Sequence, residues 1–196
     1  MGENPRLILA SASPRRDMLL NTAGLAHEVM VSHAGEDVSE PDPRVLVEKL
    51  SAIKAREVYG RISSEEDFVV IGADTVVALD GVILGKPADE QDAERMLRML
   101  SGREHHVCTG VTLMGKIGSA QRVRSFSEMS TVHVMHLSGE EILTYIATKE
   151  PMDKAGAYGI QGAFSKFVTR IEGDYFNIVG LPVSRLYREL KAFCSL

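Results

Sequence analysis

Apolar and β-branched residues gather in one stretch of the chain, where a polar dipeptide separates two apolar runs. Residues 68–71 and 76–79 are mostly apolar, the dipeptide Asp80-Gly81 favours a tight turn, and residues 82–84 resume the strand pattern. We therefore predict a buried β-hairpin. Asp74 lies within it, and because a buried, unpaired carboxylate is strongly unfavourable, we expect it to face a cleft, a cation or both. The alternative is an aspartate that caps a turn by bonding its own backbone.

A strand followed directly by a helix is predicted near the start of the chain. Residues 6–11 form an apolar strand, and Ser13 followed by Pro14 is typical of a helix start. Arg15 and Arg16 then fall in the first helical turn, where the helix dipole is already positive, so two cations are unfavourable there unless an anion lies opposite. Backbone N–H groups and guanidinium groups together predict a phosphate site. The alternative is that both arginines are solvated.

A second helix is predicted over residues 44–59. Val47, Leu50 and Val58 recur at helical spacing on one face, and Lys54 lies on that same face. A lysine on an apolar stripe either extends its ammonium to the surface or reaches a buried anion, and the pattern leaves both possibilities open.

The rest of the chain alternates between strand-like and helix-like patterns. His105 and His106 precede a predicted strand, and we expect them to be solvated rather than metal-bound. The other predicted elements are a strand at 28–32, a helix from Asp89 to Gly102, strands at 107–114 and 123–137 around a loop at 115–119, a helix capped by Ser138, an ordered glycine-rich loop at 151–162, a closing hairpin of strands at 167–171 and 175–179, and a helix from Pro182.

This order of elements predicts a single domain over residues 1–196, because no internal repeat, low-complexity tract or linker divides the chain. Strands and helices are mixed throughout. The pattern therefore indicates an α/β or α+β fold around a twisted, mixed sheet flanked by helices.

The composition of the chain limits the classes of ligand and the cellular compartment that we expect. The formal net charge is −5 and no basic run occurs, so the chain lacks the electrostatic footprint expected for a nucleic-acid polymer, whereas a small polyphosphate in a local basic pocket stays possible. Cys108 and Cys194 lie far apart without metal-type spacing, which favours a reducing compartment. No apolar run is long enough to span a membrane, and no basic leader precedes the first strand, so we expect a cytoplasmic protein.

Five motifs along the chain resemble, in order and spacing, those of the Maf family of nucleoside triphosphate pyrophosphatases. Each motif alone is weak, but the five together are specific and span nearly the whole chain. They are Ser11-Ala-Ser-Pro-Arg-Arg16, Gly72-Ala-Asp-Thr-Val-Val77, Gly85-Lys-Pro87, Asp153-Lys-Ala-Gly-Ala-Tyr-Gly-Ile-Gln-Gly162 and Gly180-Leu-Pro182.

The resemblance implies a two-lobed Maf fold similar to that of inosine triphosphate pyrophosphatases, with the active site in the cleft between the lobes and frequently a homodimer. It also implies hydrolysis between the α and β phosphates of a nucleoside triphosphate, which yields a monophosphate and pyrophosphate. A divalent cation is implied as cofactor, Mg²⁺ first and Mn²⁺ as the alternative.

Carried over position by position, the family's proton acceptor falls on Asp74. Its acidic metal-associated position falls on Glu36, which together with Asp74 would supply the hard oxygen ligands that Mg²⁺ prefers. The family's phosphate-binding and transition-state residues fall on Ser11, Arg15, Arg16, Lys54 and Lys86. Preorganised lysines and arginines can stabilise the negative charge that develops on the phosphate oxygens during attack by water.

Three positions resemble the pyrimidine-directed branch of the family. That branch carries arginine, threonine and glutamine where Arg15, Thr75 and Gln161 stand, whereas a branch acting on 7-methyl-GTP carries tryptophan, glutamine and glutamate. The amide of Gln161 offers a donor and an acceptor to the N3–H and carbonyl edge of uracil or thymine. The resemblance therefore implies dTTP and UTP as substrates.

Two other functions compete with this interpretation. Family members are associated with arrest of septum formation, so the chain could act as a nucleotide-binding regulator without turnover. It could also be a house-cleaning pyrophosphatase with a looser base pocket for non-canonical nucleotides. Asp74 favours catalysis, because a carboxylate beside phosphate repels the ligand of a protein that only binds it.

Overall fold

A long, mixed β-sheet forms the centre of the protein, whose computed structural model describes residues 5–35, 37–63 and 66–195. Within these residues, seven strands pair in one sheet: β1 (Arg6–Leu9), β2 (Glu28–Val29), β3 (Phe68–Leu79), β4 (Val82–Leu84), β5 (Glu104–Ile117), β6 (Ala120–Val134) and β7 (Val168–Glu172). The order is β2-β1-β3-β5-β6-β7, and β4 pairs with β3. The pairs β2-β1 and β1-β3 are parallel and the others antiparallel, so the predicted mixed sheet is confirmed.

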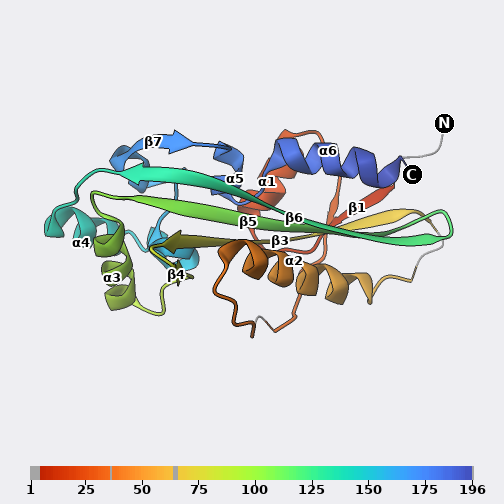
Figure 1. Ribbon diagram of the computed structural model, residues 1–196, viewed down its shortest axis with the longest axis horizontal. Helices are drawn as coiled ribbons and strands as arrows, with labels where there is room; N and C mark the ends of the chain where they lie inside the picture. Colours follow the sequence, from red (N-terminus) through yellow and green to blue (C-terminus); the bar gives the residue numbers. More distant parts are fainter. Residues whose placement is uncertain (1–4, 36, 64–65, 196) are drawn as a thin grey trace.

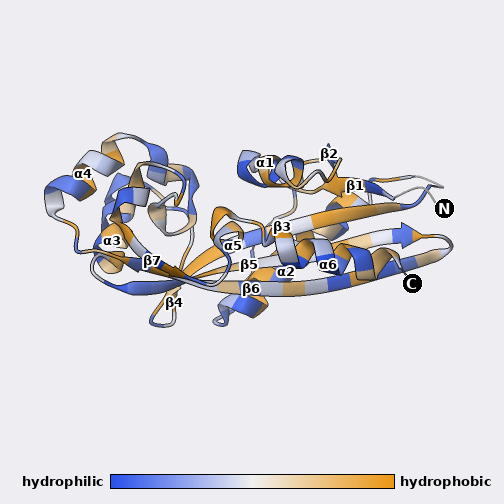
Figure 2. Ribbon diagram, turned by 90° about the horizontal axis from the view of Figure 1, so that it is seen from above, coloured by the Kyte–Doolittle hydropathy of each residue, from blue (hydrophilic) through white to orange (hydrophobic). Residues whose placement is uncertain are grey.

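Helices gather in two groups that are joined by the long strands β3, β5 and β6 (Figure 1, Figure 2). One group accompanies β1 and β2, and contains α1 (Pro14–Thr22), α2 (Pro43–Tyr59) and α6 (Val183–Cys194). The other contains α3 (Glu90–Leu100), α4 (Gly139–Ala147) and the short 3₁₀ helices η1 (Glu150–Asp153), η2 (Ala155–Ala157) and η3 (Ala163–Phe167). The short helix α5 (Tyr175–Val179) contacts β5, β6 and α1. The two-lobed α/β architecture is therefore present.

One edge of β3 is paired at both ends and open in the middle. Strand β5 pairs with the opposite edge along residues 68–78. On the open edge, β1 pairs with residues 68–71 and β4 with residues 77–79, so residues 72–76 have no strand partner on that side within the described chain. The predicted hairpin at Asp80-Gly81 is confirmed by the register that places Val77 opposite Leu84. The gap beside residues 72–76 leaves Asp74 and Thr75 beside an open space.

Helix α2 lies unusually close to the sheet because two strand positions are glycine. A Cβ on Gly72 would lie 2.2 Å from the carbonyl oxygen of Ser51, and one on Gly110 would lie 2.3 Å from that of Val47. Neither distance is tolerated between non-bonded atoms. The two glycines therefore set the separation between α2 and the middle of β3, which fixes where Lys54 can reach.

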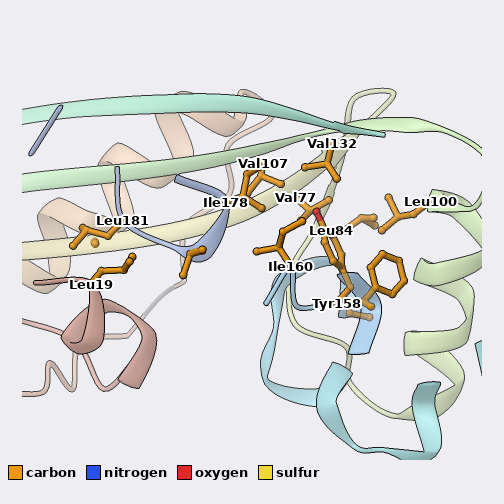
Figure 3. Close-up of a cluster of buried hydrophobic side chains, with 14 of the residues drawn as sticks. Leu19, Val77, Leu84, Leu100, Val107, Val132, Tyr158, Ile160, Ile178 and Leu181 are labelled. Carbon is orange, nitrogen blue, oxygen red and sulfur yellow. The ribbon is translucent and has the colours of Figure 1, made fainter. Parts of the chain in front are cut away.

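The other face of the sheet carries the main hydrophobic core, which extends into the second lobe. Val77, Leu84, Tyr158 and Ile160 lie together in a buried cluster (Figure 3). This contact anchors the glycine-rich loop of residues 151–162 to the β3-β4 hairpin, so the prediction of an ordered loop is confirmed. In the described chain, no helix is both long and apolar enough to cross a membrane.

Several predicted boundaries were wrong. Residues 175–179 form α5 rather than a strand, because Asp174 caps them: its Oδ1 accepts a hydrogen bond from the Phe176 N–H at 2.8 Å. The predicted loop at 115–119 is mostly strand, since β5 and β6 pair up to Ile117 and Ala120. The strand predicted at 28–32 is reduced to β2. His105, predicted to be solvated, is buried.

Candidate active site

A cavity of about 960 Å³ opens beside the unpaired segment of β3 and is lined by both lobes. One wall comes from the loop between β1 and α1 and from α2, and the other from the residues after β4 and the loop of residues 150–162. The floor includes Asp74 and Thr75. The strand gap thus places both residues between the lobes, in the lining of the cavity.

Asp74 and Lys54 form a close ion pair in this cavity. Residues 70, 72, 74 and 76 of β3 share the face covered by α2, since Val70 packs with Ala55, and Val76 packs with Leu50. Lys54 Nζ donates to Asp74 Oδ1 at 2.5 Å, and the two side chains are 14% and 13% exposed. Lys54 therefore reaches a buried anion, and Asp74 pairs with a cation instead of capping a turn.

Lys86 lies on the opposite wall, two residues after β4. It is exposed and forms no ion pair with any residue that the structure describes. Because Asp74 and Lys86 are attached to the two strands of one hairpin, the hairpin brings a second ammonium group to the cavity. This cation is available to an anionic ligand.

Arg16 is buried and bonds to three separate segments around the cavity. Its Nε donates to the Gly180 carbonyl at 2.8 Å, Nη1 to Ser11 Oγ at 3.1 Å, and Nη2 to Thr75 Oγ1 at 3.0 Å. The alternative, in which both arginines are merely solvated, is therefore wrong for Arg16. This guanidinium fixes the hydroxyl groups of Ser11 and Thr75 in the cavity wall.

Arg15 contacts the second lobe. Its Nη1 lies 3.1 Å from Asp153 Oδ2, while Lys154 Nζ lies 2.6 Å from Asp153 Oδ1. Partial burial raises the pKa of the Asp153 carboxyl, but the hydrogen bonds from Lys154 and Arg15 outweigh it and hold that pKa below its ordinary value. The anion opposite Arg15 in this structure is thus a carboxylate of the other lobe, on the cavity wall.

The family of the chain follows from its match to a model of a known protein family. The model of the family described as "Maf-like protein" matches residues 6–193. The chain belongs to the Maf-like family. The five motifs that resemble it, far apart in sequence, all contribute residues to the cavity between the lobes.

Relatives in this family are about half identical to the chain over nearly its whole length. Three proteins named dTTP/UTP pyrophosphatase illustrate this. The one from Lachnoclostridium phytofermentans is 49% identical, covering 96% of this chain and 95% of the relative. Those from a Geobacillus species and from Koribacter versatilis are 51% and 52% identical, covering 95% and 94% of this chain and 97% and 93% of the relatives.

A solved structure, the nucleoside-triphosphatase or dITP/XTP pyrophosphatase of Mycobacterium abscessus, is a distant match. It shares 13% identity over 97% of each chain with a TM-score of 0.42. That likeness is too weak to bear on the site of this Maf-like chain.

Side chains that could ligate a metal are few in the described part of the site. Glu36, predicted as a metal ligand, lies outside the described residues. Elsewhere in the described chain no group of three or more histidine, cysteine, aspartate or glutamate side chains is arranged to hold a metal. Mg²⁺ commonly uses one or two carboxylates together with substrate phosphates, and Asp74 in a cavity this size fits that mode. The described part of the site thus fits a cation that would be shared with a phosphate ligand.

Two residues of the cavity region had no signal in the sequence. Glu150 lines the cavity and accepts a hydrogen bond from Tyr145 Oη at 2.8 Å. Glu150 precedes the glycine-rich motif as an ordinary polar residue, and Tyr145 occupies an apolar position of a helix. Only the folded loop brings the two together beside Gln161, which is exposed at the cavity wall.

Proposed function

We propose that this Maf-like protein is a nucleoside triphosphate pyrophosphatase that hydrolyses dTTP and UTP to the monophosphate and pyrophosphate. The observation that carries the proposal is the Asp74–Lys54 pair at the floor of a cavity lined by further cations. The names of relatives that are about half identical over nearly the full chain support the substrate assignment.

In the proposed reaction, water attacks the α phosphorus while Asp74 accepts a proton from it. A bond forms between the water oxygen and the α phosphorus, the bond from that phosphorus to the bridging oxygen breaks, and pyrophosphate leaves with the bonding electrons. Lys54 and Lys86 reach the cavity from different elements and stabilise the negative charge that grows on the phosphate oxygens. Arg15 contributes in the same way when phosphate replaces Asp153 as its partner.

A divalent cation, Mg²⁺ or Mn²⁺, would be held by Asp74 and Glu36 together with phosphate oxygens. When bound, it neutralises phosphate charge and orients the groups that react. The chain's own residues provide the remaining functions: Arg16 holds the cavity wall through its bonds to Ser11 and Thr75, and both of these residues line the cavity beside the ligand.

Base recognition is assigned to Gln161. Its amide can donate to a carbonyl oxygen and accept from N3–H, the pattern of uracil and thymine. Turnover is favoured over binding alone because Asp74 would only weaken nucleotide binding in a regulator that does not hydrolyse its ligand. The unpaired state of both cysteines agrees with a reducing, cytoplasmic location.

A panel of nucleotides tests the proposal. The purified protein with Mg²⁺ is incubated with dTTP, UTP, CTP, GTP, ITP and 7-methyl-GTP, and release of pyrophosphate and of orthophosphate is followed separately. The proposal predicts the highest kcat/KM for dTTP and UTP, with pyrophosphate as the product. Faster hydrolysis of 7-methyl-GTP or ITP would contradict the substrate assignment, and orthophosphate as product would contradict the reaction.

A further inference from the structure

Gln161 is held in place through its backbone and not through its side chain. Its side chain is exposed at the cavity and forms no hydrogen bond with any other described residue. The preceding residue, Ile160, is buried in the cluster with Val77 and Tyr158 (Figure 3), which fixes one side of the loop. The place from which the Gln161 side chain extends into the cavity therefore depends on the backbone of residues 159–163.

That backbone is bound on both sides of Gln161 by one pair of side chains. Two residues before it, the Gly159 N–H donates to Tyr145 Oη at 3.1 Å. Two residues after it, the Ala163 N–H donates to Glu150 Oε2 at 3.0 Å. Tyr145 Oη in turn donates to Glu150 Oε1 at 2.8 Å, which links the two anchoring bonds.

The Glu150 carboxylate fits in this place because residue 162 has no side chain. A Cβ on Gly162 would lie 1.9 Å from Glu150 Oε1. The φ of Gly162 is −99°, which any residue adopts, so the glycine is required for space and not for backbone conformation. The backbone beside Gln161 thus packs directly on the carboxylate.

Tyr145 is suited to act as a permanent donor. It is 3% exposed, and both burial and the hydrogen bond to Glu150 raise the pKa of its phenol above the ordinary value. Its proton therefore stays on the phenol at neutral pH. Lys154 adds a further support, since its Nζ donates to the Glu150 carbonyl at 2.6 Å.

We propose that Tyr145 and Glu150 are positioning residues for base specificity, which hold the loop of residues 159–163 so that the Gln161 amide faces the base of the nucleotide. This inference rests on the proposed function and deepens it. In the orientation that pairs with uracil, the amide places its donor against the cytosine amino group and its acceptor against unprotonated N3, so cytosine pairs only after the amide turns over. A loop that moves lets the amide turn away, so discrimination falls.

The test compares UTP with CTP, which share ribose and triphosphate and differ at the base edge. Tyr145→Phe removes the shared hydroxyl, and Glu150→Gln replaces one acceptor oxygen by an amide nitrogen that cannot accept from Tyr145 or Ala163. For each variant, kcat/KM is measured with both nucleotides by pyrophosphate release. We expect the UTP-to-CTP ratio of kcat/KM to fall about tenfold. Partial unfolding would reduce both values equally and leave this ratio unchanged.

Tyr187→Phe and Glu94→Gln are matched controls, because Tyr187 is exposed and Glu94 pairs only with Arg98 on the surface of α3 among the described residues. Both should keep the wild-type ratio. If the wild type discriminates and both site variants retain its ratio, the positioning role is overturned while the proposed function stands. If the wild type releases no pyrophosphate from UTP or dTTP, the proposed function is overturned, and this inference with it.

Discussion

Lys54 Nζ lies 2.5 Å from Asp74 Oδ1, although the residues belong to a helix and a strand that are separated by a loop. The pair exists because α2 rests on Gly72, two residues before Asp74 on the same face of β3. Its position beside the open edge of β3 gives it access to ligands. The ion pair, the contact of α2 with β3 and the open edge of β3 thus all lie at the same part of the cavity.

Replacing Lys54 by methionine should lower both stability and activity. The variant leaves the Asp74 carboxylate largely buried without its partner, which costs on the order of 1–3 kcal/mol of the free energy of unfolding. Lys86→Met is the matched comparison, because Lys86 is exposed and unpaired within the described chain; its stability should change by less than about 0.5 kcal/mol. Both variants should slow pyrophosphate release. Urea unfolding curves of the two variants measure the difference, and equal destabilisation would contradict a structural role for the ion pair.

Gly72→Ala should damage the site from a distance. Its added methyl group would meet the Ser51 carbonyl oxygen at 2.2 Å, so α2 must move away from β3 and take Lys54 with it. We expect a loss of about 1–3 kcal/mol in the free energy of unfolding and a lower rate of pyrophosphate release. Gly60→Ala is the control, since its added carbon would have only ordinary contacts at 3.5 Å and 3.6 Å. A Gly72→Ala variant as stable and active as Gly60→Ala would show that this close contact is not required.

The sequence predicted the hairpin and its charges better than it predicted the surroundings. Asp80-Gly81 is a local turn signal, and a carboxylate among apolar residues, as at Asp74, is unfavourable without a partner. Both features could therefore be predicted from the local sequence. Gly115 was interpreted as part of a loop, yet it lies in β5, where a Cβ would approach the Phe68 carbonyl oxygen to 2.4 Å. A glycine required by a neighbouring strand cannot be distinguished from a turn glycine by local pattern.

The same limit applies to residues whose role depends on distant partners. Tyr175–Val179 has strand-like composition but forms α5, where Asn177 is buried and its Nδ2 donates to the Val107 carbonyl at 3.0 Å. His105 stood among polar residues and gave no sign of burial. Its ring is enclosed only when the loop containing Tyr158 folds over β5, a contact between residues 53 positions apart.

Buried His105 should make stability depend on pH. Its Nε2 lies 2.7 Å from Tyr158 Oη, and burial, with smaller contributions from the charges of His106 and His133, lowers its pKa from 6.5 to about 4. Between these values the unfolded state binds more protons than the folded state, so stability is complete above pH 6.5 and falls as the pH drops towards 4. The loss amounts to about 3 kcal/mol by pH 4.

The measurement is the free energy of unfolding at several pH values for the wild type and for His105→Gln. The wild type should lose more stability than His105→Gln across this range, while His136→Gln, at an exposed position, should follow the wild type. Parallel curves for the wild type and His105→Gln would contradict the assignment of the effect to this ring.

Gln161→Glu should reduce activity on pyrimidine nucleotides. A carboxylate can only accept hydrogen bonds, so it cannot donate to the carbonyl oxygen of uracil or thymine and places negative charge beside it. We expect kcat/KM for UTP and dTTP to fall about tenfold or more, with little change in stability, because Gln161 bonds to no other described residue. Unchanged kcat/KM for both nucleotides would show that the amide does not contact the base.

The most direct measurement is the rate of pyrophosphate release from UTP by Asp74→Asn, compared with the wild type and with Asp80→Asn. Asparagine keeps the shape of Asp74 but cannot accept the proton, so the rate should fall by about 10²- to 10⁴-fold, whereas the change at the exposed turn residue Asp80 should leave it unaltered. Circular dichroism confirms that each variant is folded. A folded Asp74→Asn protein that works at the wild-type rate would contradict the central claim that this carboxylate performs the chemistry.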